Sequence, residues 1–309
     1  MTAIGFLIEG QYGLNWPRWQ GILKAAEDFG YKHVFRSDHY TIGPPDLDSL
    51  ELWVSLTYAA SHTSRIEFGS LVTPVTFRHP PLTARMAAAV DDLSNGRLVL
   101  GMGAGWHERE HRQFGVPLYD VPTRFEMFEE ALQITLSLLR SDTPVSFEGK
   151  HFSLEEAILL PRPQRPGGPP ILIGGNGPKR TLPLVARYAS EWNADAILLD
   201  ELKEKMALLD ELIEQNGRQP ADVKRSLVYK LLCGKDEADL QARLEERGAT
   251  ADELRAKNTF VGTTAMLVDD LGRYADVGVE RFMLQWLDLD DIDGLEMIAS
   301  EVLPHFHTD

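Results

Sequence analysis

The feature that most constrains this sequence is a regular alternation of short apolar runs with longer segments whose apolar residues recur at helical spacing. The apolar runs, typical of buried strands, lie at 3–9, 33–39, 65–74, 97–103, 169–175, 191–196, 224–232 and 281–286. The helical segments lie at 16–29, 48–61, 82–94, 125–139, 181–189, 201–215, 264–274 and 291–302. Eight such units predict an α/β fold, a (β/α)8 TIM barrel, with a doubly wound open sheet as the alternative.

The length of 309 residues suits a single barrel domain over residues 1–309 with two insertions. A Pro- and Gly-rich segment at 143–170 and a charged helical segment at 236–258 interrupt the alternation. The second insertion is expected to help shape the ligand pocket. Thr263 is the expected N-cap of the helix that follows it.

The charge and cysteine content narrow the class of partner. The net charge of −16 disfavours nucleic acid and anionic membranes, because both repel an acidic surface. Cys233 is the single cysteine, so it cannot form an intrachain disulfide. No basic and apolar leader opens the sequence, and no apolar run approaches about 18 residues. These features predict a cytoplasmic protein.

Glycines and polar residues follow the predicted strands, at the positions that form the active-site mouth of a (β/α)8 barrel. They are Glu9-Gly10-Gln11, Ser37-Asp38-His39, Ser70-Leu71-Val72-Thr73-Pro74, Gly103-Ala104-Gly105-Trp106, Gly174-Gly175-Asn176-Gly177 and Gln285-Trp286. Glycines let a flat ligand or a phosphate approach the backbone, and the polar side chains form hydrogen bonds. The mouth is therefore expected to bind a large ligand with a flat body and polar edges.

Residues 101–111, GMGAGWHEREH, contain two further patterns. His107 to His111 read H-E-x-x-H, the spacing found in zinc proteases. The helix is expected to span only about two turns, and residues 107–113 are all charged or polar, which predicts a solvated surface helix and no metal site. The glycines at 101, 103 and 105 lack the final glycine and the downstream acidic residue of a dinucleotide fingerprint.

Four stretches carry a family resemblance: RLVLGMGAGWHEREHRQFG, RFEMFEEALQITLSLL, VSFEGKHF and PPILIGGNGPKRTLPLVARYASEWN. Together they resemble the bacterial luciferase-like superfamily, and within it the branch that depends on the deazaflavin coenzyme F420. The stretch at 169–193 is the most specific of the four. The resemblance implies an oxidoreductase that transfers a hydride between coenzyme F420 and a small organic substrate, with the cofactor at the carboxyl ends of the strands.

The resemblance also implies roles for residues at the strand exits. The phosphate loop corresponds to Gly174, Gly175, Asn176 and Gly177. A glycine-rich turn before a helix suits an anion, and this helix is expected to start at Pro178 or to be capped by Thr181. Asp38 corresponds to a residue that binds cofactor hydroxyls. His39 corresponds to a residue beside the reacting ring and is the expected catalytic acid or base, oriented by Asp38.

The third and fourth strand exits are expected to enclose the ring. The bond between Ser70 and Leu71 corresponds to a non-proline cis peptide in many family members, with Thr73 at the edge of the ring. The residues that make room for the ring correspond to Gly103, Ala104 and Gly105. Trp106 stands where some members that oxidise sugar phosphates have a catalytic glutamate, which favours a more apolar substrate. The expected substrate pocket comprises Trp106, Gln285 and Trp286.

Other functions remain open at this stage. A monooxygenase that uses reduced FMN and O2, with a separate flavin reductase, would share the ring position and the phosphate loop. Lys179 and Arg180 favour the deazaflavin, whose tail is polyglutamate. A barrel that binds flavin without turnover is disfavoured by the presence of His39, and a zinc hydrolase is the weakest alternative. Family members are often dimers, so a homodimer is expected.

Overall fold

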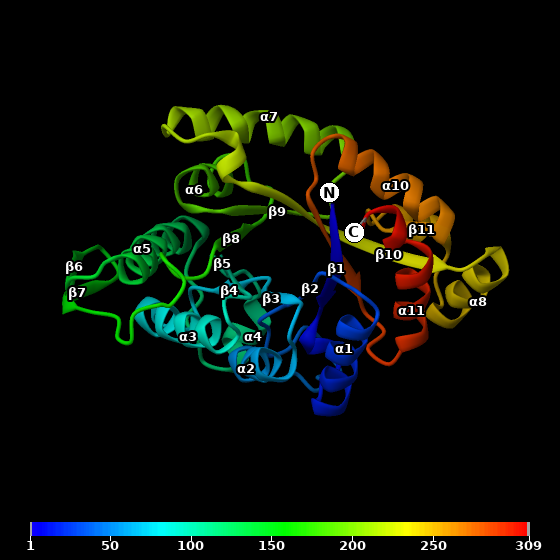
Figure 1. Cartoon of the computed structure of the whole chain (residues 1–309), viewed down its shortest axis with the longest axis horizontal. Coiled ribbons are helices and arrows are strands. Elements are labelled where there is room, and N and C mark those ends of the chain that lie inside the picture. The colour runs from blue at the N-terminus through cyan, green and yellow to red at the C-terminus, as the bar shows by residue number, and fades with distance from the viewer. Residues whose placement is uncertain (1, 308–309) are drawn as a thin grey trace.

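Parallel strands that pair side by side around a closed ring form the centre of the molecule (Figure 1). In the computed structural model, which describes residues 2–307, the ring comprises β1 (Ala3–Ile8), β2 (His33–Arg36), β3 (Glu67–Ser70), β5 (Leu98–Gly103), β8 (Ile171–Gly174), β9 (Glu191–Asp195), β10 (Lys224–Gly234) and β12 (Arg281–Trp286). The pairing of β9 with β10 closes the ring, because these two would be the edge strands of an open sheet. The predicted (β/α)8 barrel is therefore confirmed, and the open sheet is excluded.

Helices surround the strands as an outer layer (Figure 1). The main ones are α1 (Trp16–Asp28), α2 (Leu52–His62), α3 (Pro80–Leu93), α5 (Val121–Arg140), α6 (Thr181–Tyr188), α7 (Leu199–Gln215), α10 (Thr264–Asp276) and α11 (Ile292–Glu301). The expected N-cap Thr263 accepts a hydrogen bond from the Met266 amide. The second helix starts four residues later than predicted, since the Glu51 carboxylate caps the Val54 amide. None of the helices in this part of the chain combines the length and apolarity needed to span a bilayer.

The barrel interior is packed with side chains and supports the floor of the mouth. One inward-facing residue from each of six strands forms this layer: Leu7, Phe35, Val99, Leu172, Val228 and Met283. Leu71 and Val72 pack against it from the exit of β3. Inward-facing side chains that fill a barrel make it a solid core, so a ligand can enter only at the loops.

The two insertions lie on the outside of the barrel (Figure 1). Within 143–170, β6 (Val145–Glu148) and β7 (Ser153–Ala157) form an antiparallel hairpin beside α5. Within 236–258, the expected helical character is confirmed as α8 (Glu237–Arg247) and α9 (Ala251–Arg255). A short strand that sequence analysis did not predict, β11 (Phe260–Thr263), then pairs with the end of β10.

Candidate active site

A cavity of about 510 Å³ lies at the carboxyl ends of the strands, and all eight barrel strands contribute to its walls. Ten of the residues to which the sequence assigned a role in catalysis, cofactor binding or the substrate pocket line it: Asp38, His39, Leu71, Gly103, Ala104, Gly105, Trp106, Gly174, Gly175 and Gln285. The described residues of 236–258 are absent from its lining, so the expected contribution of that insertion to this cavity is wrong. Its charged segment packs beside β10 and β11 instead.

Trp286 does not line the cavity, which corrects its expected place in a substrate pocket. Successive side chains of a strand point to opposite faces. Gln285 therefore faces the cavity, where its amide donates to the Glu9 carboxylate at 2.8 Å. Trp286 faces the outer layer, with its ring 6.1 Å from that of Phe6.

Ser70 and Thr73 lie behind the cavity wall. The Ser70 hydroxyl donates to the Gly101 carbonyl at 2.7 Å, and the Thr73 hydroxyl donates to Asp38 Oδ2 at 2.7 Å. The sequence-based position of the cis peptide is wrong by one residue, because the non-proline cis bond joins Leu71 to Val72. Both residues line the cavity and give its floor an apolar surface.

The glycines of the β5 exit make room for this floor. A Cβ atom at Gly103 would lie 2.6 Å from a methyl carbon of Val72, a distance that real Cβ atoms essentially never show. Gly105 has a φ of +79°, a backbone conformation that favours glycine. The requirement for glycine at 103 thus comes from the Val72 side chain, which shapes the wall that a bound ligand would face.

His39 is held by Glu110, a partner 71 residues away in the sequence. Its Nδ1 lies 2.8 Å from Glu110 Oε1, and the other carboxylate oxygen accepts from the Tyr40 amide at 2.8 Å. Burial opposes the imidazolium, but the hydrogen bond and charge of Glu110 outweigh it and raise the pKa of His39. Glu110 is 1 % exposed, and its pKa is lowered because His39 and the Tyr40 amide stabilise the carboxylate against burial. The expected orientation of His39 by Asp38 is therefore wrong.

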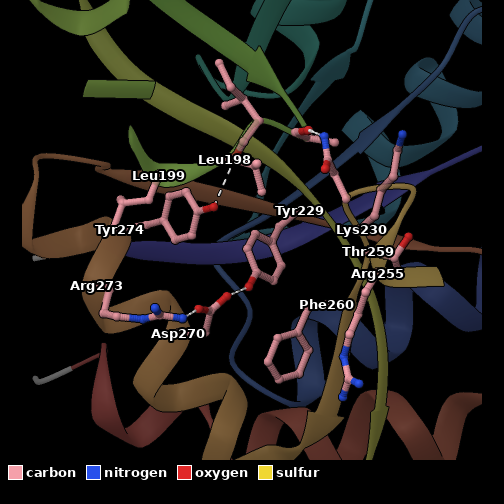
Figure 2. Close-up of a pocket in the computed structure, with 13 residues that line it drawn as sticks. Leu198, Leu199, Tyr229, Lys230, Arg255, Thr259, Phe260, Asp270, Arg273 and Tyr274 are labelled. Carbon is pink, nitrogen blue, oxygen red and sulfur yellow. Dashed lines mark hydrogen bonds and ion pairs between the residues drawn. The ribbon is translucent and has the colours of Figure 1, made fainter. Parts of the chain in front are cut away.

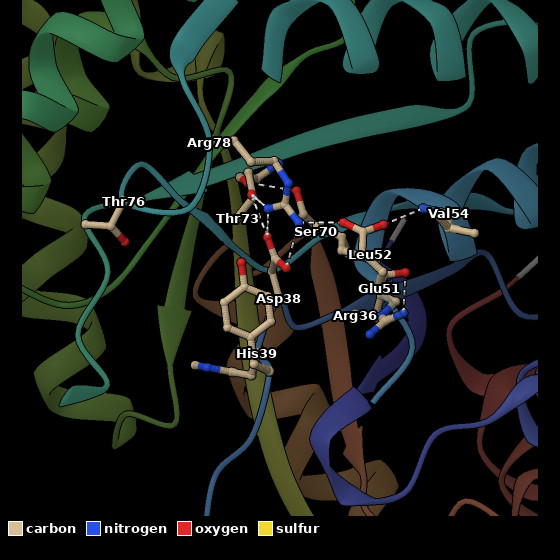
Figure 3. A network of polar contacts seen from close by, with 12 residues as sticks. Arg36, Asp38, His39, Glu51, Leu52, Val54, Ser70, Thr73, Thr76 and Arg78 are labelled. Carbon is tan, nitrogen blue, oxygen red and sulfur yellow. Dashed lines mark hydrogen bonds and ion pairs between the residues drawn. The ribbon is translucent and has the colours of Figure 1, made fainter. Parts of the chain in front are cut away.

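Asp38 belongs to a separate network, shown in Figure 3. Its carboxylate pairs with Arg78, whose guanidinium also binds Glu51 Oε1 at 2.6 Å. Thr73 donates to the same carboxylate. Arg78 thus neutralises Asp38 at the cavity edge. No local signal in the sequence pointed to it, because it lies in the loop after β4 (Thr73–Pro74), 40 residues beyond Asp38.

The predicted solvated helix around the H-E-x-x-H residues is confirmed on one face only, where Glu108, Arg112 and Gln113 are exposed. In α4 (Glu108–Gln113), Glu110 and His111 are both buried against the neighbouring strand exits. His111 Nδ1 lies 2.8 Å from the His107 carbonyl, and its Nε2 lies 2.8 Å from the Thr76 hydroxyl. Within the described chain, 2–307, no three His, Cys, Asp or Glu side chains are grouped so that they could hold a metal ion.

We therefore expect chelators to leave the activity of the purified protein unchanged. The reason is that His111 already uses both ring nitrogens, so neither is free to ligate zinc. Elemental analysis combined with an activity assay after dialysis against a chelator checks this. One tightly held zinc per chain, with activity lost on its removal, would contradict the prediction.

The glycine-rich exit of β8 offers backbone groups to an anion. Gly175 has a φ of +116°, and its amide already donates to the Asn193 carbonyl at 2.9 Å. The amides of Asn176 and Gly177 donate to no acceptor within residues 2–307. The Asn176 side chain bridges to the Asp195 backbone, which fixes the loop. Asn176 and Gly177 are not part of the cavity lining, but they directly follow Gly175, which is.

The helix that follows this loop does not begin where the sequence suggested. α6 begins at Thr181 with Arg180 as its N-cap, so Pro178 is not its first residue and Thr181 is not its cap. The amides of Thr181 and Leu182 both donate to the Gly177 carbonyl. The free amides therefore belong to the turn before the helix.

Residues 6–250 match the model of the luciferase-like monooxygenase family. The chain belongs to this family. Within it, the chain is 28 % identical to an F420-dependent glucose-6-phosphate dehydrogenase of Microbacterium testaceum (strain StLB037), an alignment that covers 95 % of this chain and 94 % of the relative. It is 25 % identical to a 4-hydroxyprotoasukamycin monooxygenase of Streptomyces nodosus subsp. asukaensis, over 96 % of this chain and 88 % of the relative.

Among solved structures, the fold is similar to that of an F420-dependent secondary alcohol dehydrogenase in complex with an F420–acetone adduct. The TM-score is 0.85, with 21 % identity and 99 % of each chain covered. The resemblance to the luciferase-like superfamily is thereby confirmed. As a luciferase-like family member with dehydrogenase and monooxygenase relatives, the chain is an oxidoreductase.

Proposed function

We propose that this protein transfers a hydride between the deazaflavin coenzyme F420 and a small organic substrate bound at the mouth of the barrel. The observation that carries the proposal is the His39–Glu110 pair, which places a titratable imidazole on the wall of the cavity at the strand exits. The F420-dependent relative aligned over 95 % of the chain supports the choice of cofactor.

The size and the lining of the cavity support binding of a flat, tricyclic ring. Its volume of about 510 Å³ is in the usual range for small-molecule sites. Leu71 and Val72 form an apolar floor, and the glycines of the two glycine-rich exits contribute stretches of wall without side chains. The free amides of Asn176 and Gly177 would hold the phosphate, and Asp38 would accept hydrogen bonds from hydroxyl groups at the cavity edge.

When bound, the deazaflavin supplies the carbon that gives or accepts the hydride. The chain's own contribution is to place the substrate and to move a proton. Glu110 holds Nδ1 of His39, while His39 Nε2 forms no hydrogen bond within the described residues and so remains free for a ligand. In its charged form His39 would donate a proton from Nε2 to a carbonyl oxygen, and in its neutral form it would accept one from an alcohol.

A titration with F420 and with FMN tests the proposal. Trp106 is 62 % exposed and lines the cavity, so its fluorescence is expected to be quenched when a flavin or deazaflavin binds. We expect quenching at lower concentrations of F420 than of FMN, and absorbance changes of F420 on adding a suitable alcohol or ketone. Failure of F420 to bind would contradict the proposal.

A second candidate is a monooxygenase that uses reduced FMN and O2, supplied by a separate flavin reductase. The 25 % identical monooxygenase relative, aligned over 96 % of the chain, favours it. Tight binding of FMN together with oxygen consumption in the presence of a reductase would select this candidate. Oxidation of an alcohol by F420 in the absence of O2 would select the first.

The pH dependence of activity is expected to report on Glu110. Because the pKa of His39 is raised above its ordinary value near 6.5, carbonyl reduction should persist into neutral pH and fall as pH rises through the folded-state pKa. In Glu110→Gln the burial of His39 is no longer opposed, so the falling limb of the kcat/KM profile should shift to lower pH. Glu108→Gln, an exposed neighbour on α4, is the matched control.

The same pair predicts the pH dependence of stability. The stabilisation from His39 is complete below its unfolded pKa and is lost as pH rises through its raised folded pKa. The stabilisation from Glu110 is present above its unfolded pKa and is lost as pH falls through its lowered folded pKa. The difference in unfolding free energy between wild type and Glu110→Gln should therefore be largest at pH values between the lowered folded-state pKa of Glu110 and the raised folded-state pKa of His39. A pH-independent difference in denaturant titrations would contradict this interpretation.

A further inference from the structure

A second cavity, of about 300 Å³, lies between the middle of β10, at Tyr229 and Lys230, and the helices α7 and α10 (Figure 2). Its surface is mainly apolar and aromatic, from Ile197, Leu199, Tyr229, Phe260 and Tyr274. It is separate from the cavity that holds His39, which none of these five residues lines. Buried apolar and aromatic surface of this kind binds the hydrocarbon part of a ligand.

The two tyrosine hydroxyls and the Asp270 carboxylate of the second cavity already have polar partners. The Tyr229 hydroxyl binds the Asp270 carboxylate, which also pairs with Arg273 (Figure 2). The Tyr274 hydroxyl donates to the Ile197 carbonyl at 3.0 Å. These contacts fix the walls and leave these groups little capacity to bind a polar ligand.

Lys230 is the one residue that lines both cavities. Within residues 2–307 its ammonium group has no hydrogen bond and no ion pair, although Asp195 on the neighbouring strand lines the first cavity too. In Figure 2 its side chain points away from Tyr229, as successive residues of a strand do, and away from the Arg255 guanidinium. The three other carboxylates of the first cavity already have partners: Glu9 with two glutamines, Asp38 with Arg78, and Glu110 with His39.

A partly buried ammonium group without a counter-charge is a recognition element for an anion. We propose that Lys230 binds the carboxylate or phosphate of an organic anion whose apolar or aromatic part lies in the second cavity. The next step rests on the proposed function. This anion is the substrate, and its reacting carbon lies in the first cavity near His39. The substrate class is then an alcohol or carbonyl compound that also carries an acidic group and a hydrocarbon body.

Calorimetric titration of the full chain, without cofactor, tests this directly. The probes are octanoate, octyl phosphate and octan-1-ol, which share a hydrocarbon body and differ in the charge of the head. We expect the two anions to bind about tenfold more tightly than the alcohol, the usual effect of one hydrogen bond to a charged group. Lys230→Met should abolish that difference, and Lys230→Arg should retain it.

Two further variants separate the head from the body of the ligand. Thr259→Trp, at the wall of the second cavity, should weaken octanoate and octan-1-ol alike, because it fills the space for the chain. Lys235→Met is the matched control, since Lys235 is 68 % exposed and lines neither cavity. It should leave all three affinities unchanged.

Equal affinity for octanoate and octan-1-ol, or no binding of either, would overturn the inference. So would a Lys230→Met variant that loses affinity for F420 or FMN while it keeps octanoate binding, because Lys230 would then hold the anionic part of the cofactor. Failure of the proposed function gives a different result. In that case neither cofactor binds the wild-type protein, whereas octanoate still binds in a Lys230-dependent manner.

Discussion

Replacing His39 by alanine is expected to lower kcat by roughly 10²–10⁴, the usual effect of losing a general acid or base. The His39 imidazole lines the cavity, and its Nδ1 is held by the Glu110 carboxylate at 2.8 Å. Affinity for the cofactor should fall much less, since the cofactor keeps its contacts at the ring and at the phosphate. Steady-state kinetics with the true substrate, together with a cofactor titration, measure the two effects separately.

A second histidine–carboxylate pair provides the control for this substitution. His151 Nε2 lies 3.1 Å from Glu126 Oε2, outside the cavity. His151→Ala should therefore leave kcat unchanged. His79 is the N-cap residue of α3 and lines no part of the cavity. Near-normal turnover of His39→Ala would make His39 structural and point to a bound water as the proton carrier.

Replacing Gly175 by valine is expected to weaken cofactor binding by roughly 10- to 100-fold, as expected for the loss of one or two hydrogen bonds to a phosphate. Gly175 lines the cavity directly before the free amides of Asn176 and Gly177. A residue with a side chain disfavours the positive φ of this position, so valine is expected to shift the backbone and displace those amides. Fluorescence titration with F420 and FMN measures the loss.

The structure adds a stability cost to this substitution. At a φ of +116°, a residue with a side chain costs about 1–3 kcal/mol, so the variant should also unfold at lower denaturant concentration. Gly217→Val is the matched control, because Gly217 also has a positive φ, of +71°. It has open space around it and does not line the cavity. It should lose stability and keep cofactor affinity. Unchanged affinity in Gly175→Val would place the phosphate elsewhere.

The sequence by itself determined the barrel and the general position of the site. The alternation of apolar runs with helical segments is a local property, and each strand and helix forms where its own residues favour it. The rule that parallel strands end at one edge then placed the exits at Asp38, Gly103 and Gly174 in one mouth. The same reasoning found His39, because histidine directly after a buried strand is a residue that carries chemistry.

What each side chain touches was decided only by the tertiary structure. His39 and Glu110 are 71 residues apart, and the sheet order β2-β3-β5 places α4, which follows β5, within reach of the exit of β2. The adjacent Asp38 pairs with Arg78 instead. Trp286 lies outside the cavity because successive residues of a strand face opposite sides of the sheet, and the neighbouring Gln285 faces the cavity. Lys230 lines two cavities, which is a further consequence of the tertiary structure. Its strand continues past the barrel to pair with β11, a contact that no local pattern in the sequence specified.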